Sequence, residues 1–317
     1  MKNKGMSERA RRPSRGTPGT AASLAAVLVR PALFRRGMRC ISVIARKFFL
    51  FQYRAVLFPR LPVSSVDHPL DAAVPFNPGF IRVYLDFTGF WIRIAGFLCR
   101  YGKAGRAMAG EFIGSITDLY LFALEVYSKN LSTTARPRYR GSLLFRIVHA
   151  LDPHLMCVPS LHVMLMIHSY TAFRRCLSRL GEEEAQRPLD DAIFRGAVVI
   201  TEAILYVKQH SVNCVAATLY AMSRFDPSLF GDAEAETFVN SLFAAGGAED
   251  VPAEYAPYYK GPLIQPPEIP ALREYILTLY RTFAGQRDPR WAEPLLEFLK
   301  AQPAAGGTRG RDTRNKN

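Results

Sequence analysis

One stretch of this chain is long and apolar enough to constrain the fold by itself. Residues 153–173 (PHLMCVPSLHVMLMIHSYTAF) form a run of 21 residues without Asp, Glu, Lys or Arg. A helix rises about 1.5 Å per residue, so a helix of that length would cross the roughly 30 Å of hydrocarbon in a bilayer. The run therefore predicts a helix buried in a membrane or in the core of a helical protein.

Five further segments are apolar but shorter or interrupted by isolated charges. Charged side chains inside a membrane span are costly and usually face the interior of a bundle. With these segments we predict an all-α integral membrane bundle of six spans. A soluble protein with several buried helices is the alternative. The five segments are 40–59, 79–99, 110–128, 193–207 and 209–223.

Positive charge is concentrated at the N-terminus. The first 60 residues hold 14 Lys and Arg against one acid, Glu8, while the whole chain has a net charge of +14. Such a segment can bind anionic lipid or nucleic acid, or fix membrane topology as a cytoplasmic flank. We favour the topological role, because the loops at 100–106 and after Arg174 are basic too. Both termini are then cytoplasmic in a multi-pass protein of the cell membrane.

Composition along the chain predicts four regions. Five cysteines show no metal-ligand or disulfide spacing, so we interpret them as buried free thiols. No cofactor or metal is expected, since the histidines do not alternate with carboxylates at ligand spacing. The regions are a disordered basic leader (1–38), a six-helix membrane domain (39–225), a soluble helical region (226–301) and a disordered tail (302–317).

Three polar segments fall at one side of the bundle in this topology. They are Lys129-Asn-Leu-Ser-Thr-Thr-Ala-Arg136-Pro, Pro-Ser160-Leu-His162, and Lys208-Gln-His210-Ser-Val-Asn213-Cys214. An Arg fork, a Lys charge and a Ser hydroxyl at a helix start suit a phosphate group. Two imidazoles suit attack on phosphorus and protonation of a leaving alkoxide. His154 and His168 are interpreted as structural residues.

These segments resemble the motifs of the type 2 phosphatidic acid phosphatase superfamily, KX6RP, PSGH and SRX5HX3D, over roughly residues 40–225. The resemblance implies that His210 forms a phosphohistidine and His162 acts as general acid. It also implies that Lys129, Arg136 and Ser160 bind phosphate. Leu161 replaces the motif Gly, and Ala203-Ile204 replaces Ser-Arg. We expect Lys208 to supply the missing cation.

The family's aspartate, which orients the nucleophilic histidine, is replaced by Cys214. Loss of the comparable carboxylate in the serine-protease triad costs about 10⁴ in rate. Asn213 could orient the ring of His210 only if the backbone shifted. We therefore expect a membrane lipid phosphate phosphatase whose activity is altered. The alternatives are a head-group phosphotransferase of the sphingolipid-synthase type and a non-catalytic protein that binds lipid phosphate. The expected partners are a membrane lipid and the bilayer, and no nucleic acid is expected.

Overall fold

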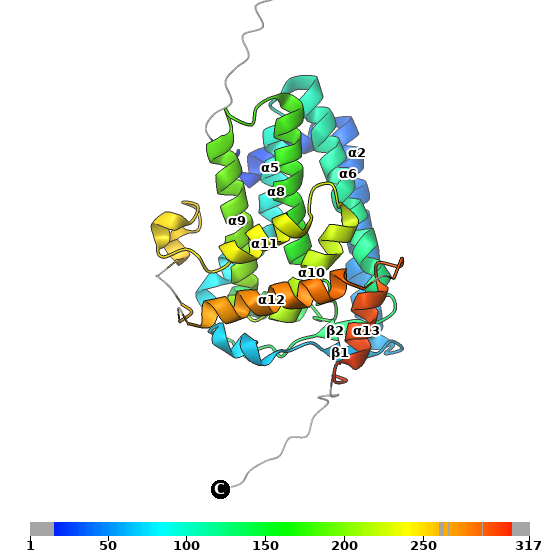
Figure 1. Ribbon diagram of the computed structural model, residues 1–317. Coiled ribbons are helices and arrows are strands. Elements are labelled where there is room, and N and C mark those ends of the chain that lie inside the picture. The colour runs from blue at the N-terminus through cyan, green and yellow to red at the C-terminus, as the bar shows by residue number, and fades with distance from the viewer. Residues whose placement is uncertain (1–15, 260–262, 266, 287, 306–317) are drawn as a thin grey trace, which may run out of the picture.

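The protein is described here from a computed structural model. It describes residues 16–259, 263–265, 267–286 and 288–305. Within these residues the chain is mostly helical, with one small pair of strands (Figure 1). The all-α prediction is therefore confirmed.

The first half of the chain supplies three long helical stretches and the elements that connect them. Residues 31–57 run through a π-helical segment, η1, as one continuous helix from α2 to α3. The elements up to α7 are α1 (Thr20–Leu28), α2 (Pro31–Val43), η1 (Ile44–Phe49), α3 (Leu50–Leu57), β1 (Val63–Ser65), η2 (Pro69–Ala73), η3 (Pro78–Phe80), α4 (Ile81–Leu85), α5 (Phe87–Leu98), α6 (Gly102–Tyr127), β2 (Leu131–Thr133) and α7 (Leu143–Leu151).

The second half contains the centre of the bundle and the helices that cover one side of it. The remaining elements are α8 (Leu161–Leu180), α9 (Arg187–Tyr206), α10 (Val212–Phe225), α11 (Asp232–Ser241), η4 (Ala248–Asp250), η5 (Ala256–Tyr258), α12 (Glu268–Ala284) and α13 (Glu293–Ala301).

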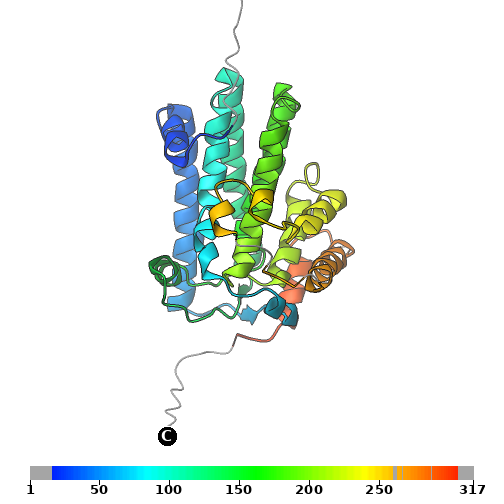
Figure 2. The ribbon, with the colours of Figure 1, turned by 90° about the vertical axis from the view of Figure 1, so that its left-hand side faces the viewer.

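The central element is α8. It packs against α5, α6, α9 and α10, and nearly every side chain from Leu161 to Phe173 is buried. A helix that is apolar on all sides needs neighbours on all sides, which this bundle supplies. The blue N-terminal helices stand along one side of the molecule, away from the C-terminal helices (Figure 2).

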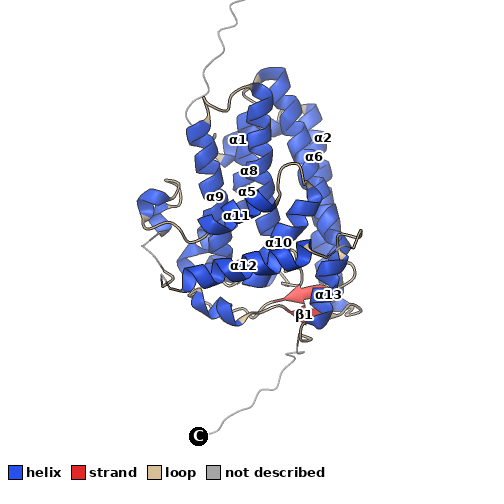
Figure 3. Ribbon diagram, viewed as in Figure 1, coloured by secondary structure: helices blue, strands red, loops and turns tan. Residues whose placement is uncertain are grey.

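The C-terminal helices pack onto the bundle. Helix α12 lies along α10 and buries five side chains: Leu272, Ile276, Leu277, Tyr280 and Phe283. Strands β1 and β2 pair in parallel, with Val63 opposite Leu131, at the end of the bundle beside α13 (Figure 3). Ala304 also bridges to Ser64 of β1. Helices α11, α12 and α13 thus lie within residues 226–301, and they share one core with the rest of the described chain.

Some predicted boundaries were wrong. Residues 20–38 of the predicted disordered leader contain α1 and the start of α2, while residues 1–15 lie outside the described part. Val27 and Leu33 are buried, so these helices are held by packing. The predicted tail is described only to residue 305. The charge-free run 153–173 is not one helix, because residues 153–160 precede α8 as a loop.

The six-span arrangement is not confirmed. Among the described residues, α6 is the one helix long and apolar enough to cross a membrane, and half of that stretch is buried inside the protein. The five cysteines are free and buried, as predicted.

Candidate functional site

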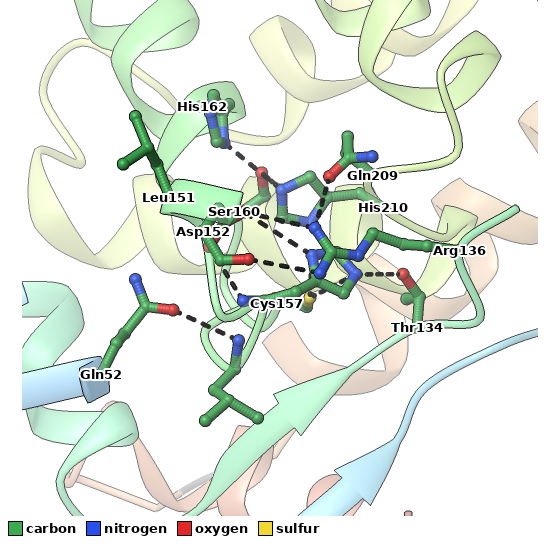
Figure 4. A network of polar contacts seen from close by, with 12 residues as sticks. Gln52, Thr134, Arg136, Leu151, Asp152, Cys157, Ser160, His162, Gln209 and His210 are labelled. Atoms are coloured by element: carbon green, nitrogen blue, oxygen red, sulfur yellow. Dashed lines mark hydrogen bonds and ion pairs between the residues drawn. The ribbon is translucent and has the colours of Figure 1, made fainter. Parts of the chain in front are cut away.

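Four of the predicted site residues meet at one end of the bundle (Figure 4). Ser160 is the N-cap of α8, and His162 lies in the first turn of that helix. His210 lies in the turn between α9 and α10, and Arg136 lies in the loop between β2 and α7. The antiparallel order of α8, α9 and α10 brings the two histidines to the same end.

The two imidazoles face each other. Nε2 of His210 lies 3.4 Å from Nδ1 of His162 and 3.2 Å from Oγ of Ser160. The ring of His162 also packs against Phe87 and Tyr84, with ring centroids 4.4 Å and 5.0 Å away. The histidine pair therefore has a polar side toward Ser160 and an aromatic side toward α4 and α5.

The loop before α8 is fixed by hydrogen bonds from several elements. The backbone N–H of Ser160 donates to Oγ1 of Thr218 on α10 at 2.8 Å. Oγ of Ser132 accepts from the backbone N–H groups of Cys157 and Val158. The hydroxyl of Tyr127 donates to the carbonyl of Pro159. Buried polar groups that are satisfied in this way hold a loop in one conformation, so Ser160 is rigidly placed.

Arg136 points to the same centre from the opposite side of the site. Its guanidinium donates to Oε1 of Gln209 at 3.3 Å and to the carbonyl of Asp152 at 3.2 Å. A carboxylate oxygen of Asp152 lies 4.0 Å away. Burial lowers the pKa of Arg136. A guanidinium nevertheless stays charged at neutral pH.

Sequence reasoning did not select Asp152 and Gln209, and it assigned His154 a structural role. Burial opposes ionisation of Asp152, but hydrogen bonds from His154 and the charge of Arg136 hold its carboxyl pKa well below the usual range. Nε2 of His154 lies 2.7 Å from Oγ1 of Thr134, and its ring lies 6.2 Å from that of His210. The sequence did offer one signal for Asp152, because this acid directly precedes the charge-free run 153–173.

The structure places the two predicted lysines away from the histidine pair. Nζ of Lys129 lies 3.8 Å from Glu125 and 3.9 Å from Glu293, and the side chain is 49% exposed. Nζ of Lys208 donates to the backbone carbonyls of Asp71 and Val74. Both ammonium groups are therefore engaged with other parts of the protein.

The two residues considered for orienting His210 are engaged elsewhere as well. The Asn213 amide donates to the carbonyl of Val66 at 3.1 Å and accepts from the hydroxyl of Tyr275 at 2.5 Å. Cys214 is fully buried, and burial raises the pKa of its thiol. Nδ1 of His210 makes no hydrogen bond to a side chain among the described residues, and the backbone of Cys157 is the hydrogen-bonding group that acts to raise the pKa of this ring.

Burial determines the charge of the histidine pair. It lowers the pKa of His162 to about 4, and together with the neighbouring imidazoles it lowers the pKa of His210. Both rings are therefore neutral near pH 7, which leaves a lone pair on each for attack or proton transfer. A bound phosphate dianion would raise both pKa values again, because a nearby negative charge favours the imidazolium.

The described residues contain no group of three or more His, Cys, Asp or Glu that could hold a metal ion. Comparisons with protein-family models, with curated proteins and with solved structures find no match to this chain.

Proposed function

We propose that this chain is a membrane lipid phosphate phosphatase that hydrolyses a phosphomonoester or pyrophosphate through a phosphohistidine on His210. The proposal is carried by one observation, the meeting of Arg136, Ser160, His162 and His210 from three separate segments at one buried end of the bundle. A nucleophile, a proton donor and a cation within reach of one point are the groups that phosphoryl transfer needs.

In the first proposed step, Nε2 of His210 attacks phosphorus and the bond to the lipid oxygen breaks. His162, which becomes an imidazolium once the phosphate dianion is bound, gives the leaving oxygen a proton. In the second step a water attacks phosphorus, its proton passes to His162, and the bond from phosphorus to nitrogen breaks. Arg136 stabilises the charge on the phosphoryl oxygens throughout. The two ring nitrogens are only 3.4 Å apart, so His162 has to turn aside when a phosphoryl group binds.

A non-catalytic protein that binds lipid phosphate is the second candidate. The surroundings of His210 favour it, because no carboxylate among the described residues hydrogen-bonds Nδ1 of this ring, and the hydrogen-bonding group that acts to raise its pKa is the backbone of Cys157.

Location at a membrane is part of the proposal. Six spans between residues 39 and 225, with the site on the outer face, are the arrangement predicted from hydropathy and charge. The exposed side chains of the described residues favour contact of one face with the surface of the bilayer instead.

Phosphate release from phosphatidic acid by the full-length protein in detergent tests the proposal, with His210→Ala as the control. We expect release by the wild-type chain, a phosphohistidine that can be trapped and identified by mass spectrometry, and neither in the variant. Equal rates for the two proteins would exclude the enzyme. Transfer of the head group to an added lipid alcohol would identify a phosphotransferase instead.

Substitution of Arg136 separates binding from cleavage. Arg136→Lys keeps the charge but loses the planar fork, so we expect inorganic phosphate to bind about tenfold more weakly, as for the loss of one charge-assisted hydrogen bond. Arg140→Lys, on an exposed side chain four residues further on, is the matched control. Calorimetry measures both affinities. If the two variants bind phosphate equally well, Arg136 is not part of the site.

A further inference from the structure

We propose that the molecule binds an anionic membrane surface through one face, formed by residues 24–58 and by α7. Sixteen large apolar side chains are exposed among the described residues. Twelve of them lie between Leu24 and Phe58, three lie on α7, and the last is Leu121 on α6. Exposed apolar side chains gathered in one region mark a contact surface.

The longest part of this face is a stripe on the continuous helix 31–57. Its exposed side chains recur at intervals of three, four or eight residues, which places them on one side of the helix. Twenty-seven residues of helix extend over about 40 Å. The side chains of the stripe are Phe34, Met38, Ile41, Phe49, Tyr53 and Val56.

Helix α7 adds a second stripe beside the first. Leu143, Ile147 and Leu151 are exposed at intervals of four residues. The hydroxyl of Tyr53 donates to the carbonyl of Leu151 at 2.7 Å and so joins the ends of the two stripes. The blue N-terminal helices of this face occupy one side of the molecule (Figure 2).

Charge identifies an anionic surface as the partner. Residues 20–60 contain eight Lys and Arg, α7 adds Arg146, and neither segment contains an acid. Among the described residues, none of the basic side chains between Arg30 and Arg60 pairs with a carboxylate. Cations of this kind beside an apolar stripe are the pattern of interfacial helices, and each adds attraction to anionic lipid.

Other sides of the bundle are unsuited to hydrocarbon. Glu111, Asp118 and Glu125 are exposed at intervals of seven residues on α6, the helix otherwise able to cross a membrane. An acidic side chain at the centre of a bilayer costs about 3 kcal/mol or more. Arg174 and Arg179 at the end of α8 are exposed too. These exposed charges favour a protein that contacts the bilayer at one face over a protein that crosses the bilayer six times.

The face connects to the candidate site. A cavity of about 380 Å³ lies between η1, α5, α6 and α7, and His162 and Asp152 form part of its wall. Phe49, Ile147 and Leu151 belong both to this wall and to the exposed stripes. If the proposed function is correct, a phosphorylated lipid reaches His162 from the bound bilayer. The membrane contact itself does not depend on catalysis.

Flotation with vesicles tests the contact on the full-length protein. We expect binding to phosphatidylcholine vesicles that contain phosphatidylglycerol, little binding to phosphatidylcholine alone, and release by alkaline carbonate. Val56→Glu and Leu143→Glu, one in each stripe, are expected to weaken binding about tenfold each. Ala233→Glu adds the same charge on an exposed position of α11 and should leave binding unchanged.

Cysteine labelling distinguishes surface contact from spanning. The five native cysteines are buried, so Asp118→Cys places one exposed thiol on α6. We expect a membrane-impermeant maleimide to label this thiol on vesicle-bound protein. Protection of the thiol together with resistance to carbonate would overturn the proposal in favour of spanning helices. Absence of binding to anionic vesicles, or equal binding by all variants, would overturn it as well.

The same assay separates this inference from the proposed function. His210→Ala is expected to bind vesicles as the wild-type protein does. Vesicle binding without any phosphate release would exclude the enzyme and support the membrane contact. Phosphate release without vesicle binding would exclude the membrane contact and support the enzyme.

Discussion

Two acids of this molecule, the partly buried Asp86 and the buried Glu202, differ in how closely a cation approaches them: Arg93 hydrogen-bonds Asp86, whereas Arg273 acts on Glu202 without forming an ion pair. Asp86 receives two hydrogen bonds of 2.7 Å from Arg93 and a third from the hydroxyl of Tyr255. Glu202 on α9 is almost fully buried, and its Oε1 accepts from the backbone N–H of Phe243, while Oε2 has no partner among the described residues. Burial raises the pKa of Glu202 to about 8. The sequence contains both acids, but only the fold distinguishes them.

Glu202 predicts how stability depends on pH. Its folded pKa is raised above the ordinary value, so between about pH 4.5 and pH 8 the folded protein retains a proton that the unfolded chain has lost. Stability therefore falls as pH rises through this window. Glu202→Gln stays neutral, and we expect it to be more stable than wild type at about pH 8, by on the order of 4 kcal/mol.

Urea unfolding at about pH 5 and pH 8 measures this difference. The two proteins should differ little at the lower pH, where the carboxyl is protonated in the folded state. A difference that does not change between the two pH values would show that Glu202 is ionised when folded.

Among the secondary-structure elements, α10 links the site to the C-terminal region. Its first turn is capped by the carboxylate of Asp71, which accepts from the backbone N–H of Val212 at 2.8 Å. Asn213 ties the same turn to Val66 and to Tyr275 of α12. These contacts hold the end of α10, and His210 is placed through the backbone that leads into it.

Removal of the hydrogen bond between Tyr275 and Asn213 tests whether Asn213 stabilises the fold without taking part in phosphate binding. Tyr275→Phe deletes the hydroxyl that donates to Asn213 and is expected to cost about 1 kcal/mol of stability, with unchanged affinity for phosphate. Tyr258→Phe is the matched control, since that hydroxyl makes no hydrogen bond with another described residue. Chemical denaturation and calorimetry measure the two quantities. Weaker phosphate binding at unchanged stability would instead assign Asn213 to the site.

Considered as a whole molecule, the chain has one core that includes its C-terminal helices. Leu295, Leu296 and Leu299 of α13 are buried, and Ser64 of β1 donates to the carbonyl of Leu299 at 2.7 Å. Nε1 of Trp291 donates to Glu125 of α6 at 2.6 Å. The region predicted from composition as a separate soluble helical part is therefore packed against β1 and α6, two elements of the first half of the chain.

Truncation tests the single core. A chain that ends at Phe225 loses α11, α12 and α13, and each large buried side chain contributes roughly 1.5–3 kcal/mol. The sum exceeds the 5–15 kcal/mol that a folded domain usually has, so we expect loss of the native state. Limited trypsin digestion and near-ultraviolet circular dichroism measure this. A protease-resistant truncated chain that still binds phosphate would show that residues 16–225 fold alone.

The sequence by itself determined the helical class, the three polar segments and the end of the bundle at which they meet. Hydropathy, charge and the alternating direction of consecutive helices can be read from the sequence, so they predict that Ser160, His162 and His210 lie at one end of the bundle. Arg136 was predicted at the same end because its loop follows a helical segment, α6 in the structure, that ends on that side of the bundle.

Only the tertiary structure decided which polar side chains are available and which surfaces are exposed. Lys129, Lys208 and Asn213 are engaged by Glu293, Asp71 and Tyr275, partners that lie 62 to 164 residues away along the chain. The apolar run that suggested a span is buried because four helices surround α8. A core helix and a membrane helix have the same composition, and they differ in what lies against them.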